Sequence, residues 1–186
     1  MADTKKRQPG RPPSEDARAA LLDAAWWRLI EDGYAALTVD AIAKAAGAGK
    51  QTLYRRWPGK AALAIEALAE KAGQRMDRPK ETAIRKGDLS AYLQAEFASL
   101  KPYAASLAIL FADAQGNPET AEAFRMAMVK PRQTALREVL AGASSDPALR
   151  DALIEAIDGA IWRRIFLGEP LDEAFARRLA LLATKR

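Results

Sequence analysis

The apolar positions along the chain recur every three to four residues, the spacing expected of helices that bury one face. In the first such run they are Leu21, Leu22, Ala25, Trp26, Leu29 and Ile30. This run predicts a helix over residues 15–32, and Gly33 follows where glycine commonly ends a helix. We find no stretch in which apolar and polar residues alternate as they do along a half-buried strand. The hydrophobic pattern therefore predicts an all-α protein.

Two short helices are predicted next, separated by a tight turn. Thr38 has the side chain of an N-cap, and the helix that it begins ends at Gly47. A third helix begins near residues 49–50 and runs until Pro58, which is placed in the first turn of a fourth helix. The fourth helix is expected to end in the region of Gly73–Pro79. Two short helices across a glycine turn are typical of a helix-turn-helix motif.

Longer helices are predicted after Pro79. The breaks between them fall at glycine and proline, in residues 101–102, 116–118, 142–147 and 168–170. Residues 119–140 read as one helix that Pro131 kinks. The whole pattern predicts about nine helices in three parts: a flexible basic arm (1–13), a helix-turn-helix domain (14–60) and a larger helical part (61–186).

Neither cysteine nor histidine occurs in the chain. Disulfides, thiolate zinc sites and His-dependent catalytic triads are therefore excluded, and we expect no metal, no cofactor and no enzymatic activity. No apolar run is long enough to span a membrane. The first residues, MADTKKRQPGRPP, also lack the apolar segment of a secretory signal. We therefore expect a cytoplasmic protein without a membrane partner.

The positive charge is concentrated in one window. Residues 41–60 contain five Lys and Arg residues and no Asp or Glu, whereas the net charge of the whole chain is only +5. The remainder of the chain therefore sums to about zero. Such a local excess predicts an anionic partner, and nucleic acid is the commonest one.

The same region carries a family resemblance. The segment LTVDAIAKAAGAGKQTLYRRWPGKAAL resembles the DNA-binding domain of the TetR (tetracycline-repressor) family, and GNPETAEAFR and GEPLDEAFARRL resemble its C-terminal ligand-binding domains. The resemblance implies a transcriptional regulator, most typically a repressor. Its homodimer would bind a palindromic double-stranded DNA operator and be released by a small-molecule effector. Residues 61–186 would then form the ligand-binding and dimerisation domain, with the fourth helix as connector.

The resemblance also assigns roles around the third helix. The residues implied to contact DNA there and at its borders are Thr38, Lys50, Gln51, Thr52, Tyr54, Arg56 and Lys60. Lys and Arg pair with guanine and Gln with adenine, so Lys50, Gln51 and Arg56 are the candidates for base readout. Leu53 and Trp57 are expected to point inward. Helical phase directs Arg55 away from Arg56, toward phosphate or toward solvent, so no role is assigned to it.

The basic arm offers a second contact with DNA. Gly10-Arg11-Pro12 resembles the core of an AT-hook, and an arginine on an extended arm can lie in a narrow minor groove. Arg11 is therefore a candidate DNA contact. The alternative is a solubilising tail that contacts nothing.

Two further sets of residues follow from the resemblance. The candidate ligand-binding residues, each of which also suits a plain core, are Tyr92, Phe97, Phe111, Met126 and Trp162. The candidate dimer-interface residues, which form apolar stripes on the last two helices, are Leu153, Ile157, Gly159, Ile161, Phe175 and Leu179. One short recognition helix reads too few bases for useful specificity, which also favours a dimer.

Two other functions remain as alternatives. The first is an RNA-binding or architectural nucleic-acid module that does not respond to a ligand. The second is a helical enzyme that uses a carboxylate-only metal site, which the absence of histidine disfavours. An RNA module would prefer single strands or A-form helices, whereas an enzyme would show no salt-dependent binding to duplex DNA.

Overall fold

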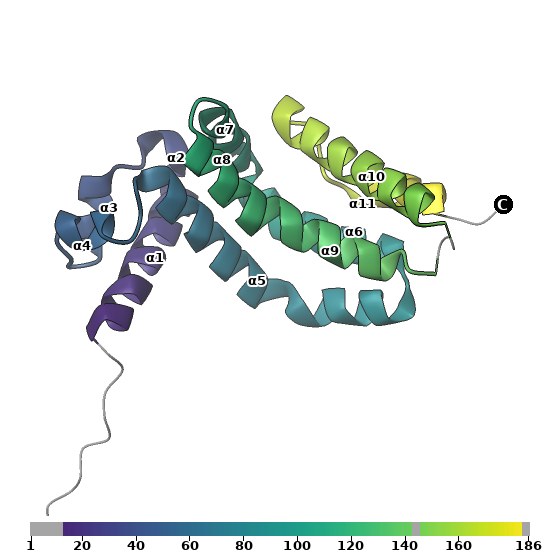
Figure 1. Cartoon of the computed structure of the whole chain (residues 1–186), viewed down its shortest axis with the longest axis horizontal. Coiled ribbons are helices and arrows are strands. Elements are labelled where there is room, and N and C mark those ends of the chain that lie inside the picture. Colours follow the sequence, from purple (N-terminus) through teal and green to yellow (C-terminus); the bar gives the residue numbers. More distant parts are fainter. Residues whose placement is uncertain (1–12, 143–145, 184–186) are drawn as a thin grey trace, which may run out of the picture.

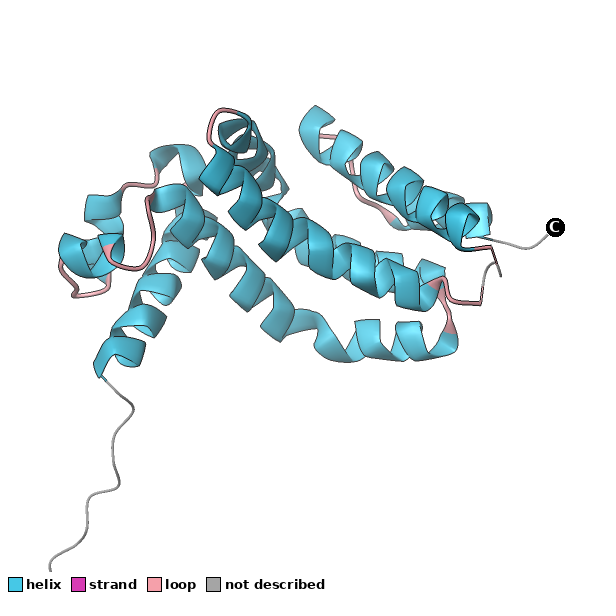
Figure 2. Cartoon of the chain, in the orientation of Figure 1, coloured by secondary structure: helices cyan, strands magenta, loops and turns pink. Residues whose placement is uncertain are grey.

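The computed structural model describes residues 13–142 and 146–183, with the backbone alone at residues 13–14 and 72–79. Over these ranges the chain consists of helices joined by short loops, and no strand is present (Figure 2), which confirms the all-α prediction. None of the described helices is long and apolar enough to cross a membrane. The α-helices are α1 (Pro13–Glu31), α2 (Gly33–Ala36), α3 (Val39–Ala45), α4 (Lys50–Tyr54), α5 (Lys60–Lys86), α6 (Leu89–Leu100), α7 (Ala104–Gln115), α8 (Pro118–Phe124), α9 (Lys130–Val139), α10 (Pro147–Leu167) and α11 (Glu173–Ala180). Shorter segments are the 3₁₀-helices η1 (Lys101–Tyr103) and η3 (Leu181–Ala183) and the π-helix η2 (Arg125–Val129).

The helix-turn-helix motif forms as the sequence predicts. Thr38 begins α3 as its N-cap, and its Oγ1 accepts a hydrogen bond from the backbone N–H of Ala41 at 3.2 Å. The turn after α3 passes through Gly47 with a φ of 62°, a conformation that favours glycine. Helices α3 and α4 lie together at one end of the molecule (Figure 1).

Helix α4 ends sooner than predicted. It stops at Tyr54, and Pro58 lies in the loop before α5, which begins at Lys60, so the placement of Pro58 inside a helix was wrong. The residue before a proline is disfavoured in the helical conformation, and Trp57 accordingly has no helical assignment. The recognition helix is therefore a short segment held between two turns.

Helix α5 is longer than predicted. It continues through Gly73–Pro79 to Lys86 and ends at Gly87, whose φ is 64°, so the expected break was wrong. A proline inside a helix removes one hydrogen bond and bends the helix without having to end it. Figure 1 shows α5 as one bent helix that reaches from the helix-turn-helix unit to the far end of the bundle.

The segment from α8 to α9 is one continuous helical run, as predicted for a helix kinked by Pro131. The π-helix η2 occupies Arg125–Val129, directly before α9, in which Pro131 stands in the first turn. Proline has no N–H and its ring crowds the preceding turn, so a widened turn is a natural accommodation. The prediction of a single helical run is therefore confirmed, and its irregularity is a π-helix directly before α9.

One hydrophobic core runs through both ends of the molecule. Its buried side chains extend from α1 to α11 without interruption. Leu63, Ile65 and Leu68 of α5 are almost fully buried and lie between the N-terminal helices and the bundle. Because this packing is continuous, a displacement in the bundle can be transmitted to α1 and α4.

Candidate nucleic-acid interface

The inward face of α4 and of the turn after it is apolar. Leu53 and Trp57 are 0% and 3% exposed, which confirms that both point into the core. On the opposite side, Lys50, Gln51 and Tyr54 are exposed. Helix α4 therefore presents polar and basic side chains at the surface, as a helix that enters the major groove must do.

The turn after α4 is tied to two other helices through one carboxylate. The indole Nε1–H of Trp57 donates to Oε2 of Glu66 on α5 at 2.6 Å, and Nε of Arg18 on α1 donates to Oε1 of the same residue at 3.1 Å. Arg18 also donates to Glu70 at 3.0 Å. The position of α4 is consequently coupled to α1 and α5.

Lys50 is paired across the motif. Its Nζ lies 2.5 Å from Oδ1 of Asp40 on α3, and both side chains are more than half exposed. This hydrogen bond to Asp40 raises the pKa of Lys50. Asp40 lies one residue before the acid-free window, so the sequence count did not include it. On binding to DNA, phosphate groups would compete with Asp40 for the ammonium group of Lys50. Because the Lys50–Asp40 pair is exposed, dissolved salt also weakens it.

Arg56 and Lys60 are placed differently from the roles that the resemblance implies. The Arg56 side chain is 24% exposed and its Nη2 lies 3.6 Å from Glu15 on α1. The Nζ of Lys60 donates to the backbone carbonyl oxygens of Leu37 at 3.0 Å and Tyr34 at 3.4 Å. Carbonyl oxygens at the end of a helix have room for further donors, and the Lys60 ammonium group supplies one to each of these two at the end of α2. Both side chains thus stabilise helices α1–α4, called the N-terminal unit below, in this structure.

Arg55 takes the exposed position instead. It follows α4 as its C-cap residue and is exposed, whereas the neighbouring Arg56 is half-buried. Of the other residues implied to contact DNA, Thr38 is exposed, Thr52 is half-buried and Arg11 lies outside the described residues. The basic and polar surface around α4, called the α4 surface below, comprises Lys44, Lys50, Gln51, Tyr54 and Arg55.

Side-chain contacts also join α1 and α2 directly to η1 and α7. The hydroxyl of Tyr34 on α2 donates to Oδ2 of Asp113 on α7 at 3.1 Å. Burial, together with this bond, raises the pKa of Tyr34. The rings of Trp26 on α1 and Tyr103 on η1 meet edge to face, with their centres 5.8 Å apart. The sequence gives no signal for either pairing, because each joins residues about 80 positions apart.

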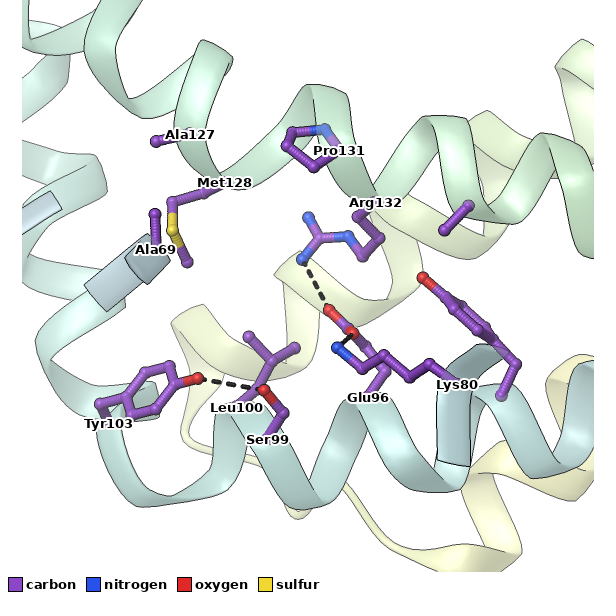
Figure 3. A pocket seen from close by; sticks show the side chains of 12 residues that line it. Ala69, Lys80, Glu96, Ser99, Leu100, Tyr103, Ala127, Met128, Pro131 and Arg132 are labelled. Carbon is purple, nitrogen blue, oxygen red and sulfur yellow. Dashed lines mark hydrogen bonds and ion pairs between the residues drawn. The ribbon is translucent and has the colours of Figure 1, made fainter. Parts of the chain in front are cut away.

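A cavity of about 220 Å³ lies within the bundle, between α5, α6, η2 and α9. Figure 3 shows its wall, to which Tyr103 contributes from one end. Its charged groups are Lys80, Glu96 and Arg132, and Lys80 and Arg132 each form an ion pair with Glu96. Its hydroxyl groups include Ser99, whose Oγ lies 3.2 Å from the Tyr103 hydroxyl.

Comparison with known proteins agrees with this architecture. Residues 21–67 match the family model described as bacterial regulatory proteins, tetR family, and residues 79–183 match the tetracyclin repressor-like C-terminal domain. The chain belongs to the TetR family. Members of this family are transcriptional regulators that bind DNA, and the helix-turn-helix motif and the function class are thereby established for this chain.

Individual TetR-family proteins match over most of their length. The DNA-binding transcriptional repressor TetR of Mycobacteroides abscessus is 33% identical and covers 89% of this chain and 90% of its own. The uncharacterized regulator YdeS of Bacillus subtilis is 29% identical over 95% of this chain and 92% of its own. The crystal structure of the TetR-family regulator SCO0332 superposes with a TM-score of 0.75, at 29% identity, over 92% of this chain and all of that one.

A further solved structure shares the fold at lower identity. FadR of Bacillus subtilis, in complex with stearoyl-CoA, has a TM-score of 0.64 and is 23% identical over 89% of this chain and 97% of its own.

The residues predicted from the TetR resemblance to bind a ligand are dispersed. Tyr92 lines the cavity. Phe97 is buried elsewhere and stacks on Phe175 with ring centres 5.4 Å apart. Phe111 and Trp162 lie outside the cavity wall in an aromatic cluster that also contains Phe124 and Phe166.

Met126 also differs from its predicted role. It is 45% exposed, whereas Met128 is 8% exposed and lines the cavity. Residues two positions apart in a helical turn face roughly opposite sides, in the π-helix η2 as in an α-helix, so Met126 and Met128 point in different directions. The signal that could have located the wall is the spacing of Tyr92, Glu96 and Ser99, which places polar groups on the buried face of α6.

The residues predicted to form the dimer interface divide into two groups. Ile157 and Ile161 are 0% exposed, and Phe175 and Leu179 are also buried within the protomer. Their side chains fill this chain's own core, so they offer little surface to a second chain. Gly159 is exposed and Leu153 half-buried, so both remain accessible.

Proposed function

We propose that this TetR-family regulator is a repressor whose dimer binds a palindromic operator and releases it when a small molecule enters the cavity of the bundle. The observation that carries this proposal is the position of Tyr103. Its side chain lines the cavity, and its ring packs against Trp26 of α1 in the N-terminal unit. A molecule that displaces Tyr103 therefore alters the packing of the helix on which α4 depends.

The effect on DNA follows from the carboxylate that joins the helices. α1 is linked to the turn after α4 through Arg18, Glu66 and Trp57. A shift of α1 therefore changes the orientation of the α4 surface relative to DNA. Release requires that the small molecule bind the DNA-free conformation more tightly than the DNA-bound one. A hundredfold difference in affinity corresponds to about 2.7 kcal/mol, which the contacts of one small molecule can supply.

The exposed face of α10 is the surface we propose for dimerisation. The residues that it carries are mainly apolar or small: Leu149, Ala152, Ala156, Gly159 and Leu167. Small residues let two helices approach closely, and the flanking leucines bury apolar area. α10 also lies in the bundle, away from α3 and α4, so this face leaves the α4 surface accessible (Figure 1).

Repression agrees with the name of one relative, the DNA-binding transcriptional repressor TetR of Mycobacteroides abscessus. A short α4 reads few bases, and two copies related by a dyad read a palindrome. The rival function, an RNA-binding or architectural module, predicts a different nucleic acid and no response to a small molecule.

The DNA contact is tested by fluorescence anisotropy with a duplex selected in vitro from a random pool. We expect Arg55→Ala to weaken binding and to reduce its dependence on salt, because one phosphate or base contact is lost. The matched control is Arg85→Ala, which removes the same charge from an exposed position near the far end of α5. Equal effects of both variants, or tighter binding to single-stranded RNA than to the duplex, would contradict the proposal.

The coupling is tested at Tyr103. We expect Tyr103→Leu to change operator affinity although the residue is remote from α4, because the edge-to-face contact with Trp26 is lost. The matched control is Ser99→Ala, which removes the hydroxyl partner of Tyr103 and leaves the ring contact in place. If Tyr103→Leu folds and binds the operator as the wild type does, the cavity is not coupled to DNA through this contact.

A further inference from the structure

The cavity wall contains a buried cationic donor without an acceptor. Nη2 of Arg132 is buried and has no hydrogen-bond partner among the described residues. Of the other guanidinium nitrogens, Nε donates to Asp158 at 2.6 Å, and Nη1 forms a longer ion pair with Glu96 at 3.8 Å. The Arg132 side chain is only 3% exposed, so solvent does not satisfy the remaining donor. A buried charged donor left unpaired is costly, and an acceptor that reaches it is correspondingly favoured.

Among the side chains that the structure describes, the charges around this donor balance. Lys80 and Arg132 provide two positive charges, and Glu96 and Asp158 provide two negative ones. All four side chains are mostly buried, with exposures of 22%, 3%, 8% and 10% in that order. A ligand with a net charge would have to displace one of these pairs or remain uncompensated, and both are expensive in a buried site. The balance therefore favours an uncharged ligand.

The remainder of the wall limits the size and polarity of such a ligand. Leu100, Met128, Ala69 and Ala127 contribute apolar surface to the same wall (Figure 3). A cavity of 150 Å³ holds a benzene ring. The volume here, about 220 Å³, suits one substituted ring or a chain of similar bulk.

We infer that the cavity binds a small uncharged molecule, of about one substituted ring, whose carbonyl or hydroxyl oxygen accepts a hydrogen bond from Nη2 of Arg132. This inference rests on the proposed ligand response and names the class of effector for that site. Neutral aromatic or short aliphatic ketones, esters and phenols belong to this class, whereas carboxylates, amines and long acyl chains do not.

The test compares four probes of nearly equal size on the wild-type full-length protein by titration calorimetry. Acetophenone has the acceptor, ethylbenzene lacks it, benzoate is an anion and benzylamine is a cation. We expect acetophenone to bind about tenfold to a hundredfold more tightly than ethylbenzene, because it alone satisfies the charged donor without adding a charge. Equal binding of ethylbenzene, tighter binding of benzoate or benzylamine, or no saturable binding of acetophenone would overturn the inference.

A variant assigns the preference to Arg132. Arg132→Lys keeps the positive charge beside Asp158 but loses the planar fork of donors, so the ratio between acetophenone and ethylbenzene should fall toward one. The matched control is Arg137→Lys, which makes the same exchange at an exposed position of α9 outside the cavity wall and should keep the ratio. An unchanged ratio in Arg132→Lys would overturn the assignment. The four-probe series on the wild type does not depend on either variant folding.

Operator binding, measured in the same samples, separates this inference from the proposed function. If acetophenone binds with the expected preference but leaves operator affinity unchanged, the ligand class is supported and the proposed release mechanism fails. If the protein binds no duplex at all, the repressor proposal fails while the probe ratios still decide the ligand class. If ethylbenzene binds as tightly as acetophenone, the inference fails whatever happens at the operator.

Discussion

Glu66 offers a sharp test of how α4 is held in place. The carboxylate accepts a hydrogen bond from the Trp57 indole at 2.6 Å and another from Arg18 at 3.1 Å. Glu66→Leu removes the acceptor and leaves the N–H of Trp57, a residue only 3% exposed, without its partner. Such a loss costs about 1–3 kcal/mol. For a chain of this length, that lowers the Tm by roughly 2–12 °C.

Glu66→Gln separates the hydrogen bond from the charge. Glutamine keeps an oxygen that accepts from Trp57, and Arg18 keeps Glu70 at 3.0 Å as its partner. The ion pair that is lost is partly exposed, with side-chain exposures of 26% and 40%, so we expect a cost below about 1 kcal/mol. Glu70→Gln is the matched control, because it removes a carboxylate from Arg18 without touching Trp57.

The assay is thermal unfolding followed by circular dichroism at one protein concentration, since the stability of a dimer depends on concentration. Operator affinity is measured in parallel, and it should fall in Glu66→Leu because the turn after α4 is loosened. The reasoning is refuted if Glu66→Gln destabilises as much as Glu66→Leu, since the charge would then matter more than the bond to Trp57. It is equally refuted if Glu66→Leu has the stability of the wild type.

Three further predictions concern the N-terminal unit. Gly49→Ser should raise the free energy of unfolding, measured by chemical denaturation, by a few tenths to about 1 kcal/mol. Gly49 is the N-cap of α4, with a φ of −78° that any residue can adopt and with open space where a Cβ would lie. A lower free energy of unfolding would show that the serine does not cap α4. Lys60→Met should destabilise by about 1–2 kcal/mol, because the carbonyl oxygens of Leu37 and Tyr34 lose the charged donor that they share. Unchanged stability together with weaker operator binding would instead assign Lys60 a purely phosphate-binding role. Tyr34→Phe should be less stable than the wild type at pH 8. Because the pKa of Tyr34 is raised, the protonated hydroxyl contributes its full stabilisation below about pH 10 and loses it progressively as the pH rises toward the raised pKa. The difference in the free energy of unfolding between the wild type and Tyr34→Phe should therefore be smaller at about pH 10.5 than at about pH 8. An equal difference at both pH values would contradict this.

Helical phase and capping chemistry predicted the local features of the motif well. Leu53 and Trp57 point inward, and Thr38 caps α3, because each of these outcomes depends on neighbours within a few residues. The extent of α5 was missed since proline and glycine inside a helix are tolerated when packing holds both sides of the break.

The partners of long charged side chains could not be predicted in the same way. Arg55 and Arg56 are adjacent in the sequence, yet one is exposed and the other meets Glu15, some 40 positions away. Likewise, the period of an apolar stripe does not show whether its partner is the same chain or a second one. Ile157 and Ile161 belong to the stripe that faces the protomer's own core, and sequence alone could not separate it from a dimer-facing stripe.

The cavity shows the same limit. Tyr92, Phe97, Phe111, Met126 and Trp162 were reasonable candidates for a ligand site, yet of these five only Tyr92 lines the wall. The groups that give the wall its chemistry are Glu96 and Arg132, which are brought together from α6 and α9 by tertiary packing. Burial of a charged pair is not visible in composition, because most charged residues lie at the surface.

The central claim is that two copies of α4 read a palindromic duplex, and in-vitro selection of bound DNA from a random pool tests it most directly. The account predicts an enriched inverted repeat whose half-sites bind one protomer each, with enrichment lost in Arg55→Ala and retained in Arg85→Ala. Selection of a single asymmetric site, or no enrichment over the starting pool, would contradict it.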